Sequence, residues 1–148
     1  MKNLFASVVL VLGVIAFSYA QNDIAFQMKS NNGKLFTEDN GTYSLSLVVL
    51  GLKSDKEVEN FKSVITSNSI VKQFEISPAV AGSENHKANF ILTSKEKEAL
   101  ISLFKSANVN QLIVDEKTYT LDQFDQMKAD LKAKKQPPVE EKRKSSNK

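Results

Sequence analysis

From Tyr43 onward, the apolar residues of this chain switch repeatedly between a period of two and a period near 3.6. The short period is typical of a strand with one buried face, and the longer period is typical of an amphipathic helix. We therefore expect four strands and two helices, in the order strand 43–50, helix 55–67, strand 70–77, strand 86–92, helix 95–107 and strand 112–114. Right-handed crossovers leave few ways to connect this β-α-β-β-α-β order.

Helix-start signals support this division. Gly51 ends the first strand, and Ser54 with Glu57 has the spacing of a capping box. A second start signal lies at 93–96. The fold class that we expect is α+β, a ferredoxin-like βαββαβ sandwich with two helices on one face of a four-stranded antiparallel sheet. The side chains expected in its core include Leu45, Leu47, Val49, Val58, Phe61, Val64, Ile65, Phe74, Ala88, Phe90, Leu92, Leu100, Leu103 and Phe104.

The first twenty residues resemble a cleavable signal peptide. Lys2 gives a short positive start, Leu4 to Phe17 is almost entirely apolar, and Ser18-Tyr19-Ala20 places small residues before a cut near Ala20-Gln21. The alternative is a membrane anchor, but this apolar run is short against the roughly 20 residues that span a bilayer. We expect a periplasmic or secreted protein.

The remaining segments are assigned by composition and by turn signals. Residues 21–42 are expected to form an N-terminal arm or a short hairpin, since Ile24, Phe26 and Met28 alternate with polar residues before a turn signal. The main domain is expected at 43–116. A C-terminal helix is expected at 117–136, capped by Thr120 with Gln123, and a disordered basic tail at 137–148.

Composition excludes several kinds of chemistry. The chain has no Cys, which rules out disulfides, thiol catalysis and thiolate metal sites. Residues 128–148 hold eight Lys/Arg and three Asp/Glu, a net charge of +5, whereas residues 21–127 hold eleven and fourteen, a net charge of −3. The folded part therefore gives little support for a nucleic-acid surface. The tail is expected to be a solubilising end, with weak contact to anionic surfaces as the alternative.

The stretch from Val49 to Phe61 resembles the heavy-metal-associated domain of copper chaperones and metal-transporting ATPases. That family has a strand ending in Gly-Met-x-Cys-x-x-Cys, followed by a helix. Here Gly51 matches the Gly, Leu52 stands at the Met position, and Ser54 and Glu57 stand at the two Cys positions. Later landmarks agree, namely Val71, Phe74, the 88–92 strand and Leu100-Ile101. The similarity runs from about Tyr43 to Asp115, and it implies a ferredoxin-like fold whose metal-binding CxxC motif has been lost.

The residues that remain at this loop are poor ligands for a soft ion. A pair of thiolates suits Cu(I), whereas a hydroxyl does not, and a lone carboxylate prefers harder cations. The candidate metal ligands are Ser54, Asp55, Glu57 and His86. We expect none of them to hold a metal, because the first three suit a helix cap and His86 is expected to be a solvated loop residue beside Glu84. The pair Asp115-Glu116 is likewise expected to be solvated.

Two functions known on this fold do not suit the residues. Acylphosphatase needs an Arg in the loop after its first strand, and the only Arg here is Arg143. RNA-recognition motifs stack bases on aromatic residues of the open sheet face. The residues expected on that face are instead Ser44, Ser46, Gln73, Glu75 and Asn89. We therefore expect no enzyme, no cofactor and no nucleic-acid partner.

The function that these observations favour is that of an exported, non-enzymatic domain with a degenerate metal site. Its role would be binding or assembly with an unidentified protein of the cell envelope or the exterior. Two alternatives stay open. One is metal-ion binding or transport through oxygen or His ligands. The other is a peptide- or protein-binding module that uses a sheet edge.

Overall fold

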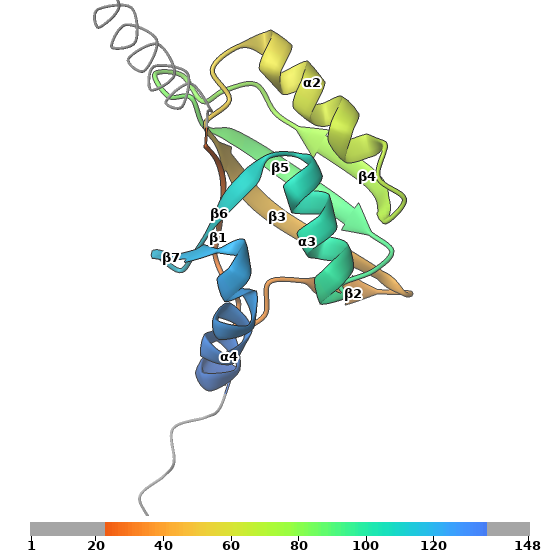
Figure 1. The fold of residues 1–148 in the computed structure, drawn as a ribbon, viewed down its shortest axis with the longest axis vertical. Helices are drawn as coiled ribbons and strands as arrows, with labels where there is room; N and C mark the ends of the chain where they lie inside the picture. Colours follow the sequence, from red (N-terminus) through yellow and green to blue (C-terminus); the bar gives the residue numbers. More distant parts are fainter. Residues whose placement is uncertain (1–22, 136–148) are drawn as a thin grey trace, which may run out of the picture.

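The computed structural model describes residues 23–135, so the expected leader and the expected tail at 137–148 lie outside the described residues. The elements are β1 (Ile24–Met28), β2 (Thr37–Asp39), β3 (Thr42–Leu50), α2 (Asp55–Thr66), β4 (Val71–Ile76), β5 (His86–Leu92), α3 (Lys97–Ser106), β6 (Val109–Val114), β7 (Lys117–Thr120), the 3₁₀ turn η1 (Leu121–Gln123) and α4 (Phe124–Lys135). One mixed sheet has the order β4-β5-β3-β1-β6-β7, and β2 pairs with β3 beside β1. Helices α2 and α3 lie on one face of this sheet (Figure 1).

The predicted strands and helices occur in the predicted order, as β3-α2-β4-β5-α3-β6. The expectation of a four-stranded antiparallel sheet is wrong, because the sheet formed by residues 23–135 has seven strands and is mixed. Strand β1 is inserted between β3 and β6. It runs antiparallel to β3, with Phe26 opposite Val49, and parallel to β6, with Phe26 opposite Leu112.

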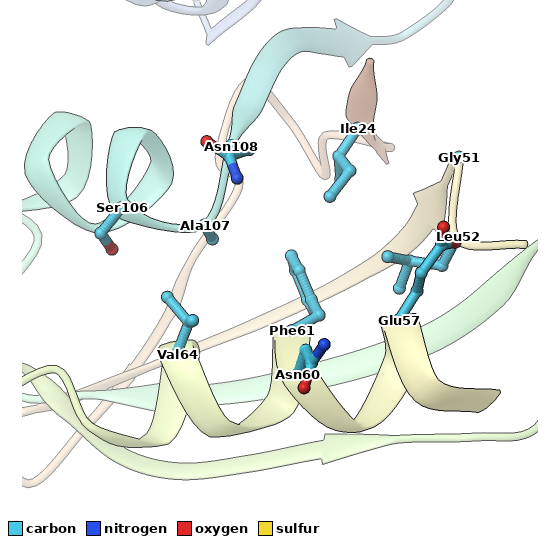
Figure 2. Close-up of a pocket in the computed structure, with 10 residues that line it drawn as sticks. All are labelled: Ile24, Gly51, Leu52, Glu57, Asn60, Phe61, Val64, Ser106, Ala107 and Asn108. Carbon is cyan, nitrogen blue, oxygen red and sulfur yellow. The ribbon is translucent and has the colours of Figure 1, made fainter. Parts of the chain in front are cut away.

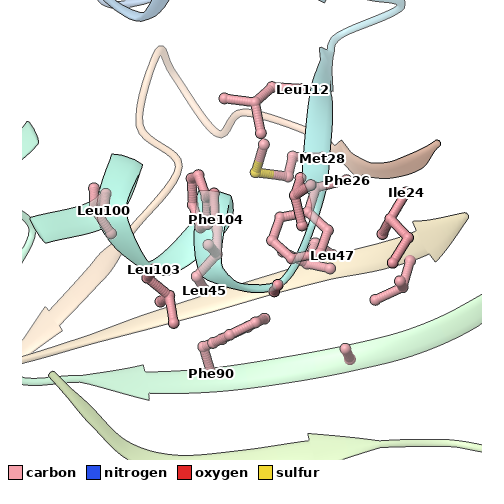
Figure 3. Close-up of a cluster of buried hydrophobic side chains, with 14 of the residues drawn as sticks. Ile24, Phe26, Met28, Leu45, Leu47, Phe90, Leu100, Leu103, Phe104 and Leu112 are labelled. Atoms are coloured by element: carbon pink, nitrogen blue, oxygen red, sulfur yellow. The ribbon is translucent and has the colours of Figure 1, made fainter. Parts of the chain in front are cut away.

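Strand β1 is therefore neither an arm nor half of a local hairpin. Phe26 is 0% exposed and lies at the centre of the core, with its ring edge-on to Phe61, Phe90 and Phe104 at centroid distances of 6.1, 5.9 and 5.2 Å. Figure 3 shows Phe26 surrounded by aliphatic and aromatic side chains of the core. Aromatic pairs in this geometry stabilise a core beyond the area that they bury.

The C-terminal elements also differ from the expected single helix at 117–136. Residues 117–120 form β7, which pairs with β6 through a two-residue turn at Asp115-Glu116. Both turn residues have positive φ, 48° and 71°, the conformation of a tight hairpin turn. The predicted capping box of Thr120 and Gln123 is confirmed, and it begins η1 and then α4. The apolar side of these two elements, formed by Leu121, Phe124, Met127 and Leu131, is buried in the core.

Candidate functional site

The loop between β3 and α2 is the place where the family resemblance puts a metal site. Gly51 opens this loop with φ of 96°, and a Cβ at this position would lie 2.6 Å from the carbonyl oxygen of Asp23. Only glycine fits this close approach to the start of β1. Leu52 follows and is buried. The Gly-Leu pair therefore fixes the path of the loop.

Ser54 and Glu57 together close the first turn of α2. The Ser54 hydroxyl accepts a hydrogen bond from the Glu57 main-chain N–H at 3.2 Å. The Glu57 carboxylate accepts from the Lys53 main-chain N–H at 2.6 Å. The predicted cap is confirmed, with the difference that the Glu57 carboxylate meets Lys53 and not Ser54. Both side chains that stand at the expected Cys positions thus satisfy main-chain donors at a helix start.

Asp55, in the same turn, is exposed and lies where a negative charge interacts favourably with the helix dipole. His86 does not join these residues. It is the first residue of β5, lies opposite Val49 and is only 6% exposed. Its Nδ1 is 3.0 Å from the carbonyl oxygen of Ser77. The expectation of a solvated loop histidine is wrong, because the pairing of β5 with β3 turns His86 toward the core side of the sheet.

The predicted metal candidates therefore form two separate groups in the structure. Among residues 23–135, no three His, Cys, Asp or Glu side chains lie close enough to share a metal ion. Ser54 and Glu57 are brought together by the cap, and His86 is held by the main chain after β4.

A groove adjoins this loop, between α2, the start of β1 and the turn after α3. Its volume is about 190 Å³. Figure 2 shows Phe61 and Val64 pointing from α2 toward Ile24 and the turn at 106–108. The groove is lined by both apolar and polar residues. They are Ile24, Gly51, Leu52, Glu57, Asn60, Phe61, Val64, Ser106, Ala107 and Asn108. Val64, expected in the core, is 37% exposed because it borders this groove.

A second polar cluster, which we call the Asp115 junction, lies at the turn between β6 and β7. One carboxylate oxygen of Asp115 accepts from the Ser30 main-chain N–H at 2.8 Å, and the other accepts from the Ser30 hydroxyl and from Lys134 Nζ at 2.7 Å. The side chain is 20% exposed. The hydrogen bonds from Lys134 and Ser30 lower the pKa of Asp115 to about 2. Asp115 therefore joins the segment after β1, the β6–β7 turn and α4, and the expectation that it is solvated is wrong.

A neighbouring carboxylate ties β7 to α4 in a similar way. Asp130 accepts from Lys117, from the Tyr119 hydroxyl at 2.7 Å and from the Gln126 amide at 2.9 Å. These hydrogen bonds lower the pKa of Asp130 to about 2, and the one from Lys117 has the largest effect. Burial, aided by Asp130, raises the pKa of Tyr119. A cavity of about 250 Å³ between this hairpin and α4 is lined by both aspartates, and each is paired with a lysine.

The open face of the sheet carries the residues that the alternation predicted. Ser44, Ser46, Gln73, Glu75 and Asn89 are all exposed, and the Ser46 hydroxyl donates to the Asn89 amide oxygen at 2.7 Å. A sheet-edge partner would meet β4 or β7, each of which pairs with a single strand among residues 23–135, β5 and β6 respectively.

Comparison of the chain with protein-family models, curated proteins and solved structures finds no match. Within residues 23–135, none of the helices has the length and apolar character needed to span a bilayer.

Proposed function

We propose that this chain is an exported, non-enzymatic domain with a binding or assembly role in the cell envelope. It resembles a heavy-metal-associated domain in which the metal loop has become a helix cap. In this view the ferredoxin-like core is β3-α2-β4-β5-α3-β6, widened by β1. The observation that carries the proposal is the pair of hydrogen bonds by which Ser54 and Glu57 satisfy main-chain donors at the start of α2.

The location follows from the leader, whose cleavage near Ala20-Gln21 would release the chain to the periplasm or the exterior. Thiols are hard to keep reduced in such compartments. A relative of a thiolate metal domain that has no Cys is therefore easier to understand there than in the cytoplasm.

The groove beside α2 is the surface that we propose for the partner. Its apolar lining includes Ile24, Phe61 and Val64, and its polar lining includes Asn60 and Asn108. A largely apolar lining with a few polar groups is typical of sites that bind a side chain or a small ligand. A volume of about 190 Å³ suits one or two side chains of a partner protein.

Calorimetric titration of the chain from Gln21 to Lys148 with Cu, Zn and Ca ions tests the proposal. We expect no stoichiometric binding, because Ser54 Oγ and Glu57 Oε2 already accept hydrogen bonds from the main chain. The variants are Glu57→Ala and His86→Ala, and Glu59→Ala serves as the matched control because it is an exposed glutamate of the same helix. Tight binding that either variant abolishes and the control retains would contradict the proposal and favour the metal-handling alternative.

A further inference from the structure

Three lysines of α4 share one side of the helix. Lys128, Lys132 and Lys135 follow the spacing i, i+4 and i+7, which places side chains one above another. All three are exposed, and none of them takes part in the four ion pairs found among residues 23–135. We call them the lysine stripe.

The ion pairs of the two carboxylates of α4 are made with lysines from other elements and not with the stripe. Asp125 is bound by Lys97 of α3, with Nζ 2.5 Å from the carboxylate. Asp130 is bound by Lys117 of β7. The pKa of each aspartate is lowered by its lysine partner, so both remain ionised and paired at neutral pH. Lys128 also lowers the pKa of Asp125, so the stripe is partly balanced at that end, and Lys132 and Lys135 carry most of its excess positive charge.

A neighbouring segment extends the same positive surface. The turn at 31–34 packs against the last turn of α4, since a Cβ on Gly33 would overlap the carbonyl oxygen of Leu131 and lie 3.3 Å from the main-chain nitrogen of Lys135. This contact brings the exposed Lys34 to the end of the stripe.

We infer that the lysine stripe, together with Lys34, docks the domain on the surface of an anionic lipid bilayer. Lysines are compact point charges that suit diffuse layers of head groups, whereas bidentate recognition of single phosphates favours arginine. The stripe carries no aromatic or aliphatic side chain of its own to insert into lipid, so binding would be peripheral and electrostatic. Clusters of four or more basic residues attract anionic bilayers, and the stripe reaches this number together with Lys34. The choice of partner rests on the proposed envelope location, but lipid binding itself can be measured without it.

The test is sedimentation of the chain from Gln21 to Lys148 with vesicles of equal phosphatidylglycerol and phosphatidylcholine, and with phosphatidylcholine alone. We expect binding to the first only, weakened by added salt. The stripe variant Lys128→Gln/Lys132→Gln/Lys135→Gln should lose on the order of 100-fold in partitioning, given the contribution of each lysine near a charged surface.

The matched control removes the same charge from other helices. Lys56→Gln/Lys62→Gln/Lys105→Gln changes three exposed lysines of α2 and α3 and should partition nearly as the wild type does. Circular dichroism verifies that both variants fold. The inference would be overturned if the two variants lost binding equally, or if the wild type did not bind anionic vesicles. It would also be overturned if the chain bound soluble dextran sulfate without binding vesicles. The metal titration above does not depend on these results, so the two proposals can fail separately.

Discussion

The α2 cap and the Asp115 junction each use a carboxylate to satisfy main-chain N–H groups, but they differ in how far along the chain their partners lie. Glu57 accepts from Lys53, and Ser54 accepts from Glu57, so every partner is within four residues. Asp115 accepts from Ser30 and from Lys134, which are 85 and 19 residues away. The cap organises one helix turn, whereas the junction holds three separate segments together.

The surroundings of the two clusters differ as well. The hydrogen bonds of the α2 cap lie in an exposed loop. In the Asp115 junction, the hydrogen bonds that Ser30 donates to Asp115 are half-buried. Hydrogen bonds to a charged group gain strength as water is excluded. We therefore expect the junction to contribute more to the free energy of unfolding than the cap, although only the cap belongs to the loop where the sequence suggests a function.

The largest expected effect is that of Asp115→Asn. Asparagine tolerates the positive φ of this position, so the change removes the charge and spares the turn. We expect the free energy of unfolding at neutral pH to fall by about 2 kcal/mol, because hydrogen bonds to Ser30 and Lys134 lose their ionic partner. Urea denaturation measures this change.

The effect of Asp115→Asn should depend on pH in a defined direction. The pKa of Asp115 is about 2 in the folded protein, below its ordinary value of 3.8. A lowered pKa gives stability that is fully present above the ordinary value and is lost as the pH falls from there toward 2. The difference in free energy of unfolding between the wild type and Asp115→Asn should therefore shrink as the pH falls across this interval. A gap that stays constant with pH would show that the charge of Asp115 is not what stabilises the junction.

A smaller effect is expected for Ser54→Ala. Loss of an N-cap hydroxyl costs about 1 kcal/mol, so the free energy of unfolding should fall by about half as much as for Asp115→Asn. Ser54→Asp, which can still accept from the Glu57 N–H, should stay close to the wild type. If Ser54→Ala proves more destabilising than Asp115→Asn, the ranking of cap and junction is wrong.

Much of the fold could be predicted from the sequence because its signals are local. Strand β5 has the predicted bounds, and the caps at Ser54 and Thr120 rest on residues three apart. The alternation of Ile24, Phe26 and Met28 was visible, but nothing local indicates that this strand pairs with both β3 and β6. The additional strand is what turns the expected antiparallel sheet into a mixed one.

The candidate site could be predicted only where its contacts are local in sequence. The cap at Ser54 and Glu57 is a short-range pattern, and it was found. The burial of His86 depends on its pairing opposite Val49, and the role of Asp115 depends on Ser30. Those partners are distant in sequence. An acidic residue followed by a lone strand-like run, as in Asp115 to Thr120, is the one local signal that would have suggested the β6–β7 hairpin.

If Ser54 and Glu57 form a helix cap and not a metal site, thermal unfolding should be the same with and without metal. A metal that binds only the folded chain raises the unfolding midpoint in proportion to the logarithm of its concentration above Kd. We expect excess Cu, Zn or Ca to leave the unfolding midpoint at the value that is measured in chelator. A midpoint that rises with metal concentration, and that no longer rises in Glu57→Ala or His86→Ala, would contradict it.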